Sequence, residues 1–576
     1  MGTLTPTPRW LALAAWIVGL LLLVATLRQA WLATWSPTGI PTFDVADYVL
    51  RAHDLADALR AGDLAAWGRR FLTPDLHPPL HPALVGLVFA VGAPTMAAAC
   101  TVAFIELAVA MGMLVVLGRR ADLGAGAAAG LVAAVLTSAS LLHRGLATSP
   151  MTEPLSLVAV LGTLALALPA DGPASRRRAV GVGVAVLAAG LVRYNLVPML
   201  LVPLLLDHAL RVLLRRRPWT DTRWIAWIVP TVVGFGVWGW VQPGLEADVR
   251  YFFTNNDSGV PLWSAANLRW LPEAFATDVA GVAVLAGLVA VATVGGLVSA
   301  LRRLRAGEPA GELLVHAFAF VAMAALFVHP FKLERNLYVV APALYLVAAL
   351  PVVRLARRHV GVGTVALVAS VAAFVVLRGA TDARVDAKRS FSEEPELRAA
   401  LDRVVARARA AERVVIAGAH RDLNEHLFAL TLRGEAPGTE VVLQSVYPPD
   451  CDAETPPPNV VCTPTEVDRW LTTEGTIFAT VEQAGPPGRK AQRGRREGTV
   501  RMARDVAQRV ATVPGLVPEE LDLHRARLKL TIYAPGLGGE APRGAVEAAP
   551  VEVGPPLKGR RRRDAEAAKR AAEAAE

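Results

Sequence analysis

Apolar stretches long enough to cross a lipid bilayer recur along the first two-thirds of this sequence, between Trp10 and Leu377. A helix needs roughly 20 mostly apolar residues to cross the hydrocarbon core, and few soluble proteins contain such stretches repeatedly. Hydrophobic residues make up 53% of the chain and the mean hydropathy is +0.40, which excludes a soluble globular protein. We therefore expect a mainly α-helical, polytopic integral membrane protein.

Basic clusters between the apolar stretches predict the orientation of the helices. The formal charge of +9 lies largely in short arginine clusters such as Arg119–Arg120, so it reports topology and implies no nucleic-acid partner. The first apolar run is too long for a cleaved signal peptide, and we interpret it as a retained span with a cytoplasmic N-terminus. These rules predict about eleven spans in the cell (inner) membrane. The predicted spans are Trp10–Leu27, Thr95–Gly118, Leu123–Leu142, Pro154–Pro169, two within Ala179–Leu206, Trp224–Val241, Val279–Leu301, Leu313–Val328, Leu337–Val353 and Val362–Leu377.

Two parts of the chain are predicted to lie outside the membrane. The apolar run Leu80–Val91 is too short to cross, and it is predicted to be a juxtamembrane helix in the first outer loop. After the transmembrane domain of residues 1–378, residues 384–540 have the pattern of an extracytoplasmic α/β domain. The strands are predicted at Val414–Ala417, Val441–Leu443, Ile477–Val481 and Leu528–Tyr533, and the helices near Glu396–Ala411 and Val500–Ala511.

Two further features follow in this C-terminal part. Cys451 and Cys462 flank a proline-rich loop, where a disulfide fits an oxidising compartment and two free thiols are the alternative. Residues 541–576 are charged and of low complexity, which predicts a disordered tail.

Polar residues gather at the predicted outer ends of the spans, as an active site on that face requires. Asp44 opens a predicted amphipathic helix that also contains Asp47 and Tyr48. The simpler alternative is that Asp44 is the N-cap of this helix and Asp47 its N3 partner. His77 and His81 flank two prolines, which weakens the helical geometry that a metal pair at this spacing would need.

Several charged residues lie beside or within predicted spans. Glu153 precedes a span, where it could serve as a helix-start residue. Arg193, followed by Tyr194, and Glu106 lie at membrane depth, where an ionised group is costly without a counter-charge. Lys332 and Arg335 occupy a short outer loop, against the positive-inside expectation. Phosphate is a suitable counter-charge for this pair, and a mutual surface cluster with Glu334 is the alternative.

Together these residues resemble the GT-C superfamily of membrane glycosyltransferases, in particular its protein O-mannosyltransferase and lipid A aminoarabinose transferase branch. The resemblance covers about residues 10 to 350. Asn336 departs from the family pattern, in which a tyrosine often follows the arginine. The matching pieces, in family order, are Asp44 with Tyr48, His77–Leu80, Thr152–Pro154 with Arg193–Tyr194, and Lys332 with Arg335 and Pro342.

This resemblance implies an inverting hexosyl- or pentosyltransferase in the cell envelope. Its donor would be a polyprenyl-phosphate-linked sugar in the membrane lipid, and its acceptor a glycan, lipid or protein hydroxyl at the outer face. The resemblance implies no certain cofactor, and a divalent metal remains an open alternative. It implies that Asp44 is the catalytic base, that Lys332, Arg335 and Arg193 bind the donor phosphate, and that Asp47, Tyr48, His77, His81, Glu153 and Tyr194 bind substrate.

Two other classes of protein also have polytopic membrane domains. A transporter or lipid flippase would place ionisable groups near the bilayer midplane and often contains related halves. In this sequence most candidate groups cluster at one face, and no duplicated half is visible. A non-enzymatic scaffold would explain the C-terminal domain but would leave Asp44, Lys332 and Arg335 without a shared role.

Overall fold

The computed structural model describes most of the transmembrane domain and the core of the C-terminal domain. The described residues are 9–35, 39–72, 78–168, 175–214, 217–218, 220–241, 261–329, 334–382, 384–385, 391–392, 395–418, 423, 425–444, 460–461, 467–471, 473–483, 495–524 and 528–535. The predicted residues His77, Lys332, Cys451 and Cys462, and the predicted tail, lie outside these ranges.

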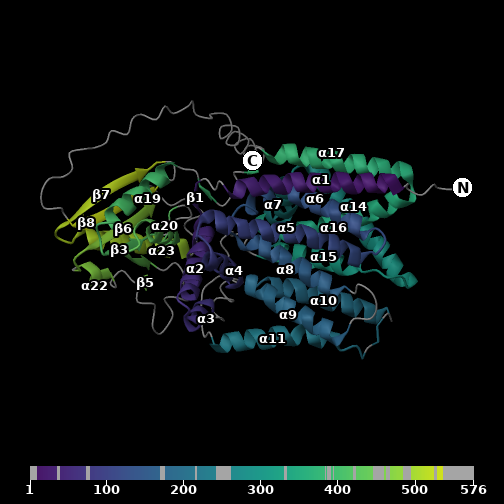
Figure 1. Ribbon diagram of the computed structural model, residues 1–576, viewed down its shortest axis with the longest axis horizontal. Helices are drawn as coiled ribbons and strands as arrows, with labels where there is room; N and C mark the ends of the chain where they lie inside the picture. Colours follow the sequence, from purple (N-terminus) through teal and green to yellow (C-terminus); the bar gives the residue numbers. More distant parts are fainter. Residues whose placement is uncertain are drawn as a thin grey trace.

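A bundle of long apolar helices forms the larger part of the molecule, as predicted. Figure 1 shows α1 and α17 side by side along one edge of the bundle and α11 along the opposite edge. Within the described residues, seven helical segments are long and apolar enough to cross a membrane. They contain α1 (Arg9–Thr34), α5 (Met96–Ala121), α10 (Leu196–Leu213), α11 (Arg223–Val241), α14 (Ala283–Ala306), α16 (Ala341–Arg358) and α17 (Val360–Asp382).

Shorter helices occupy the remaining predicted spans. They are α6 (Gly126–Ala139), α8 (Thr152–Ala167), α9 (Arg176–Val192) and α15 (Glu312–Val328). Because these helices are shorter than a typical span, the total of about eleven stays a prediction. The break predicted within Ala179–Leu206 is confirmed, since α9 ends before an extended Arg193 and α10 begins at Leu196.

Buried ion pairs join the bundle at the end away from the C-terminal domain. Arg354 contacts Asp122 and Glu312 at 2.7 Å each, and Arg303 contacts the same two carboxylates at 3.3 and 3.0 Å. Arg303 also pairs with the exposed Glu308 at 3.1 Å, so every charge in this network has a partner of opposite sign.

Helices α2 (Phe43–Arg60), α3 (Leu64–Leu72) and α4 (Leu80–Val91) lie between the bundle and the C-terminal domain (Figure 1). The predicted juxtamembrane helix is therefore present as α4, and it packs along α2. Gly86 permits this close approach, because a Cβ atom there would lie 2.9 Å from the backbone oxygen of Ala52. The helix α2 carries Asp44 into the bundle, so this packing positions the predicted base.

Short elements lie between the bundle helices, and one pair of short strands joins the chain before α2 to the chain after α17. They are α7 (Leu141–Leu146), α13 (Ala265–Ala274), the π-helix η1 (Phe275–Val279), the 3₁₀ helix η2 (Glu334–Tyr338) and the paired strands β1 (Ile40–Pro41) and β2 (Phe391–Ser392). The span predicted from Val279 begins instead at Ala283, because the chain first completes the π-helical turn.

The C-terminal domain contains a six-stranded sheet in the order β5-β4-β3-β6-β8-β7. Strands β5, β4, β3 and β6 are parallel, and β8 and β7 are antiparallel neighbours. The strands are β3 (Arg413–Ala417), β4 (Glu440–Gln444), β5 (Val460–Val461), β6 (Thr476–Gln483), β7 (Leu516–Leu523) and β8 (Leu528–Pro535). All four predicted strands are confirmed, and β5 and β7 were not predicted.

Helices cover both faces of this sheet. Alternation along β3 sends Val414 and Ile416 to one hydrophobic cluster and Val415 and Ala417 to another, as expected for a strand buried on both faces. The first cluster includes residues of α19 (Pro395–Ala408) and α20 (Glu425–Glu435), and the second those of α22 (Asp468–Leu471) and α23 (Arg495–Ala511). The predicted helices correspond to α19 and α23, whereas α20 was not predicted.

Candidate active site

Four charged side chains from separate parts of the chain meet at the end of the bundle that faces the C-terminal domain. Asp44 of α2 forms an ion pair with Arg335 of η2. The Arg335 Nε atom lies 3.6 Å from Glu153 Oε1 at the start of α8, and Arg193 Nη1 lies 3.1 Å from the same oxygen. We call Asp44, Arg335, Glu153 and Arg193 the charge cluster. Its two carboxylates and two guanidinium groups balance one another.

Burial makes this balance necessary for two members of the charge cluster. The side chain of Glu153 is 1% exposed and that of Arg193 is 12% exposed, so each would be strongly destabilised as a lone ion. Asp44 and Arg335 are 23% and 25% exposed, so they form the accessible end of the cluster. The second oxygen of Glu153 is buried and has no hydrogen-bond partner among the described residues.

Asn336 extends the charge cluster and was not predicted as a site residue. Its side-chain oxygen accepts a hydrogen bond from Arg193 Nη2 at 3.4 Å. The one sequence feature that singled out Asn336 was that it directly follows Arg335, at a position where GT-C sequences often have tyrosine. Among the described residues, Glu334, the predicted surface partner of Arg335, forms no ion pair with it, whereas Asp44 and Glu153 of other elements do.

Tyr48 follows Asp44 by one helical turn and lies on the same side of α2. Burial raises the pKa of its phenol well above the ordinary value, and the negative charges of Asp44 and Glu153 raise it further. The phenol therefore stays protonated at any physiological pH, and it can donate a hydrogen bond but cannot act as a base.

His81 and Glu106 form a second buried pair beside the charge cluster. His81 Nδ1 lies 3.2 Å from Glu106 Oε1, and His81 is fully buried. The His81 ring also meets the Tyr48 ring edge-on, with centroids 5.9 Å apart. His81 is therefore the polar partner of Glu106 inside the bundle, and it is buried behind Tyr48, away from any accessible surface.

The other predicted site residues are not members of the charge cluster. Asp47 is buried, and its Oδ1 lies 3.8 Å from His426 Nδ1 of the C-terminal domain. Tyr194 is buried against Trp238, with ring centroids 5.9 Å apart. The alternative in which Asp44 is the N-cap is wrong, because α2 begins at Phe43 and Thr42 occupies the cap position.

A metal site is not evident in the described ranges. No group of three or more histidine, cysteine, aspartate or glutamate side chains there is close enough to hold an ion. His77 lies outside those ranges, so the structure describes only His81 of the two predicted histidines.

Comparison with solved structures identifies the fold. ArnT from Cupriavidus metallidurans in its apo state aligns with a TM-score of 0.59 and 14% identity over 92% of this chain and 100% of that chain. The same protein bound to undecaprenyl phosphate aligns with a TM-score of 0.58 and 14% identity over 91% of this chain and 99% of that one. This chain has the GT-C fold. The predicted resemblance to GT-C glycosyltransferases is therefore confirmed at the level of the fold.

The GT-C fold of this chain extends over the bundle and the C-terminal domain together, since the alignments cover more than nine-tenths of both chains. The Archaeoglobus fulgidus oligosaccharyltransferase tethered with an acceptor peptide aligns less well, with a TM-score of 0.46 and 12% identity over 73% of this chain and 63% of that one. No family model and no curated protein matches the sequence.

Proposed function

We propose that this protein is an inverting glycosyltransferase that moves a sugar from a polyprenyl-phosphate-linked donor to an acceptor hydroxyl. The observation that carries the proposal is the charge cluster, in which an accessible carboxylate and an accessible guanidinium lie together at one end of a GT-C fold. One solved structure with this fold contains undecaprenyl phosphate, which supports a lipid phosphate as the leaving group.

In the proposed reaction Asp44 is the general base. Its carboxylate takes the proton of the acceptor hydroxyl as the acceptor oxygen bonds to the anomeric carbon of the sugar. The bond from that carbon to the phosphate oxygen breaks at the same time, and the lipid phosphate leaves with the electron pair. A single displacement from the opposite face inverts the anomeric centre.

Arg335 and Arg193 are proposed to stabilise the charge that develops on the departing phosphate. Guanidinium groups bind phosphate oxygens in a bidentate manner, and a partly dehydrated site strengthens that interaction. Lys332, from the same loop as Arg335, is proposed as a third cation. The partnerless oxygen of Glu153 is suited to accept a hydrogen bond from a sugar hydroxyl, which supports a role in orienting substrate.

The ion pair between Asp44 and Arg335 suggests an order of binding. A guanidinium held by a carboxylate is less available to phosphate, and a carboxylate held by a guanidinium is a weaker base. Donor phosphate would take Arg335 from Asp44 and leave the carboxylate able to accept a proton. We therefore propose that the donor binds before the acceptor hydroxyl is activated.

The proposed setting is the cell (inner) membrane, with the N-terminus in the cytoplasm and residues 384–540 on the outer side. The transferred sugar is proposed to be a hexose or a pentose, and its acceptor a glycan, a lipid or a protein. Profiling the glycans and lipids of a strain that lacks this protein would identify both, because the unused donor accumulates and the glycosylated acceptor disappears.

The test of the base is Asp44→Asn in the purified, lipid-reconstituted protein, assayed with the radiolabelled polyprenyl-phosphate sugar that accumulates in the deletion strain. We expect sugar transfer to fall by about 10³-fold or more, because general-base catalysis contributes roughly 10²–10⁴-fold. Asp402→Asn is the matched control, since Asp402 is an exposed carboxylate of α19. Full activity of Asp44→Asn would refute the assignment.

A further inference from the structure

The C-terminal domain packs against α2 on the side opposite to Asp44. Ala46 follows Asp44 by two residues, which is about 200° around a helix. Whereas Asp44 contacts the bundle through Arg335, Ala46 is buried in the hydrophobic cluster of α19, α20 and the sheet. Ile40, which precedes α2, belongs to the same cluster. The helix α2 is thus shared between the bundle and the C-terminal domain.

Polar contacts from the C-terminal domain follow α2 along its length. Strand β1, directly before the helix, pairs with β2. Near the start of the helix, in its second turn, Asp47 faces His426 at 3.8 Å. Near its end, the guanidinium of Arg433 donates to the carboxylates of both Asp54 and Asp57. Arg433 therefore forms a double ion pair that fastens α20 to the last turns of α2, and we call this contact the α2 clamp.

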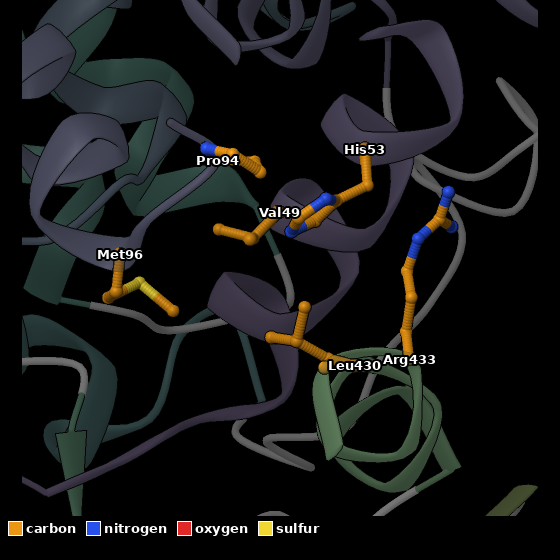
Figure 2. Close-up of a pocket in the computed structure, with 7 residues that line it drawn as sticks. Val49, His53, Pro94, Met96, Leu430 and Arg433 are labelled. Atoms are coloured by element: carbon orange, nitrogen blue, oxygen red, sulfur yellow. The ribbon is translucent and has the colours of Figure 1, made fainter. Parts of the chain in front are cut away.

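A pocket of about 390 Å³ lies next to the α2 clamp. Figure 2 shows Leu430 and Arg433 of α20 reaching toward Val49 and His53 of α2. The lining residues are Val49, His53, Pro94, Met96, Leu430, Arg433 and Gly434. Because a cavity interrupts the contact between the two helices, side-chain packing there is incomplete. Arg433 therefore supplies polar contacts between α20 and the last turns of α2 beside an incompletely packed surface.

We propose that Arg433 is a positioning residue for the transfer reaction, because it holds α2 and thereby keeps Asp44 against Arg335. This inference rests on the proposed function, in which Asp44 is the base. Arg335 is fixed by η2 and the bundle, whereas Asp44 is fixed by α2. A helix is stiff over this length, so a shift of its last turns moves its first turn. Displacing a catalytic group by about 1 Å can cost about 10²-fold in rate.

The experiment compares Arg433→Ala with Arg409→Ala in the full-length, reconstituted protein. Arg409 is the matched control because it pairs at 3.5 Å with Glu435 inside the C-terminal domain and does not contact α2. For Arg433→Ala we expect kcat to fall by about 10–10²-fold with the donor KM within about twofold, since the clamp does not contact the donor. Arg433→Lys should retain most of kcat, because it keeps one ion pair. Arg409→Ala should match the wild type.

Hydrogen exchange of the α2 amides provides a second readout that does not depend on catalysis. We expect exchange in residues 44–50 to become about tenfold faster in Arg433→Ala and to stay unchanged in Arg409→Ala. The double variant Arg433→Glu with Asp57→Arg should restore slow exchange and much of kcat, because it rebuilds an ion pair with reversed charges. Unchanged exchange in Arg433→Ala would overturn the clamp.

The two proposals fail in different ways. If faster exchange in α2 leaves kcat intact, the clamp exists but Arg433 does not position the base, and the inference is overturned. If the wild-type protein transfers no sugar while exchange still depends on Arg433, the proposed function fails and the attachment of α2 remains.

Discussion

At the scale of single residues, the contact between Asp44 and Arg335 is the most consequential feature of the molecule. It joins residues nearly three hundred positions apart, one from a juxtamembrane helix and one from a 3₁₀ turn between two apolar helices. Glu153 and Arg193 lie on the buried side of this contact and are almost fully buried themselves. The accessible pair can therefore exchange partners with substrates first, whereas the proposed contacts of Arg193 with phosphate and of Glu153 with a sugar hydroxyl lie deeper in the site.

Replacing Arg335 tests the proposed contact with the donor phosphate. We expect Arg335→Ala to weaken the binding of undecaprenyl phosphate by about 10-fold to 10²-fold, because a hydrogen bond to a charged group contributes about 1.5–3 kcal/mol. Titration of the purified protein with undecaprenyl phosphate measures this affinity. Arg302→Ala is the control, since Arg302 is exposed near the far end of α14. Equal affinity of the two variants would count against a phosphate contact at Arg335.

The sequence predicted the members of the charge cluster but not their partners. Hydropathy and the arginine pattern fix the depth of Asp44, Glu153, Arg193 and Arg335 relative to the membrane. They leave the rotation of each helix and the order of neighbours undetermined, because these depend on side-chain packing. For this reason the sequence predicts Asp47 and Tyr194 as site residues but does not predict their contacts with His426 and Trp238.

At the scale of secondary-structure elements, long apolar helices and buried strands were the predictable parts. The sequence patterns of segments such as α5 and β3 are compatible with only one type of secondary structure. Strand β7, LVPEELDL, was missed because it contains a proline and three acidic residues and is an edge strand with only one buried position. Helix α20 was missed as well, although it supplies His426 and Arg433 to α2.

The contact between α2 and α20 should weaken in acid. Burial lowers the pKa of His53 below its ordinary value of 6.5, and the nearby Arg433 charge lowers it further, against the opposing effect of Asp57 and Asp54. Above pH 6.5 the imidazole is neutral in both the folded and the unfolded chain, so it has no effect on stability. Below pH 6.5 the unfolded chain binds the proton more readily, and stability is lost as the pH falls toward the folded pKa.

We therefore expect the Tm of the detergent-purified protein to fall more for the wild type than for His53→Gln between pH 7.5 and 5.5, by about 1–3 °C. Intrinsic tryptophan fluorescence during heating measures this difference. The His53 ring also packs against Phe89, with centroids 4.8 Å apart, so the substitution itself lowers Tm at both pH values. The prediction therefore concerns only the change in Tm between the two pH values. An equal fall in Tm in the wild type and in His53→Gln would contradict it.

At the scale of the whole molecule, the two ends of the bundle differ in charge arrangement. Asp122, Glu312, Arg303 and Arg354 form an ion-pair network at one end, and the exposed Glu308 adds a third carboxylate to it through Arg303. At the other end the charge cluster retains accessible members, and the C-terminal domain lies directly against it (Figure 1). Such asymmetry suits a protein that reacts at one membrane surface, whereas a transporter needs a polar path between both surfaces.

The orientation that this asymmetry suggests can be tested by cysteine labelling in intact cells. The protein has three cysteines, so the test starts from a Cys451→Ser, Cys462→Ser variant in which only the buried Cys100 remains. In this background Glu474→Cys, at an exposed position of the C-terminal domain, should react with a membrane-impermeant maleimide added outside. Arg302→Cys should react only after permeabilisation, because the positive-inside rule puts the arginines at the end of α14 in the cytoplasm.

The opposite labelling pattern would place the charge cluster on the cytoplasmic side. The donor phosphate and the acceptor hydroxyl would then have to meet in the cytoplasm, where nucleotide-linked sugars are available and a lipid-linked donor is not needed. Orientation therefore decides between two classes of donor, and it does so without any assay of transfer. If Glu474→Cys is labelled from outside, the C-terminal domain faces the outer leaflet. The donor then reaches Arg335 from that leaflet.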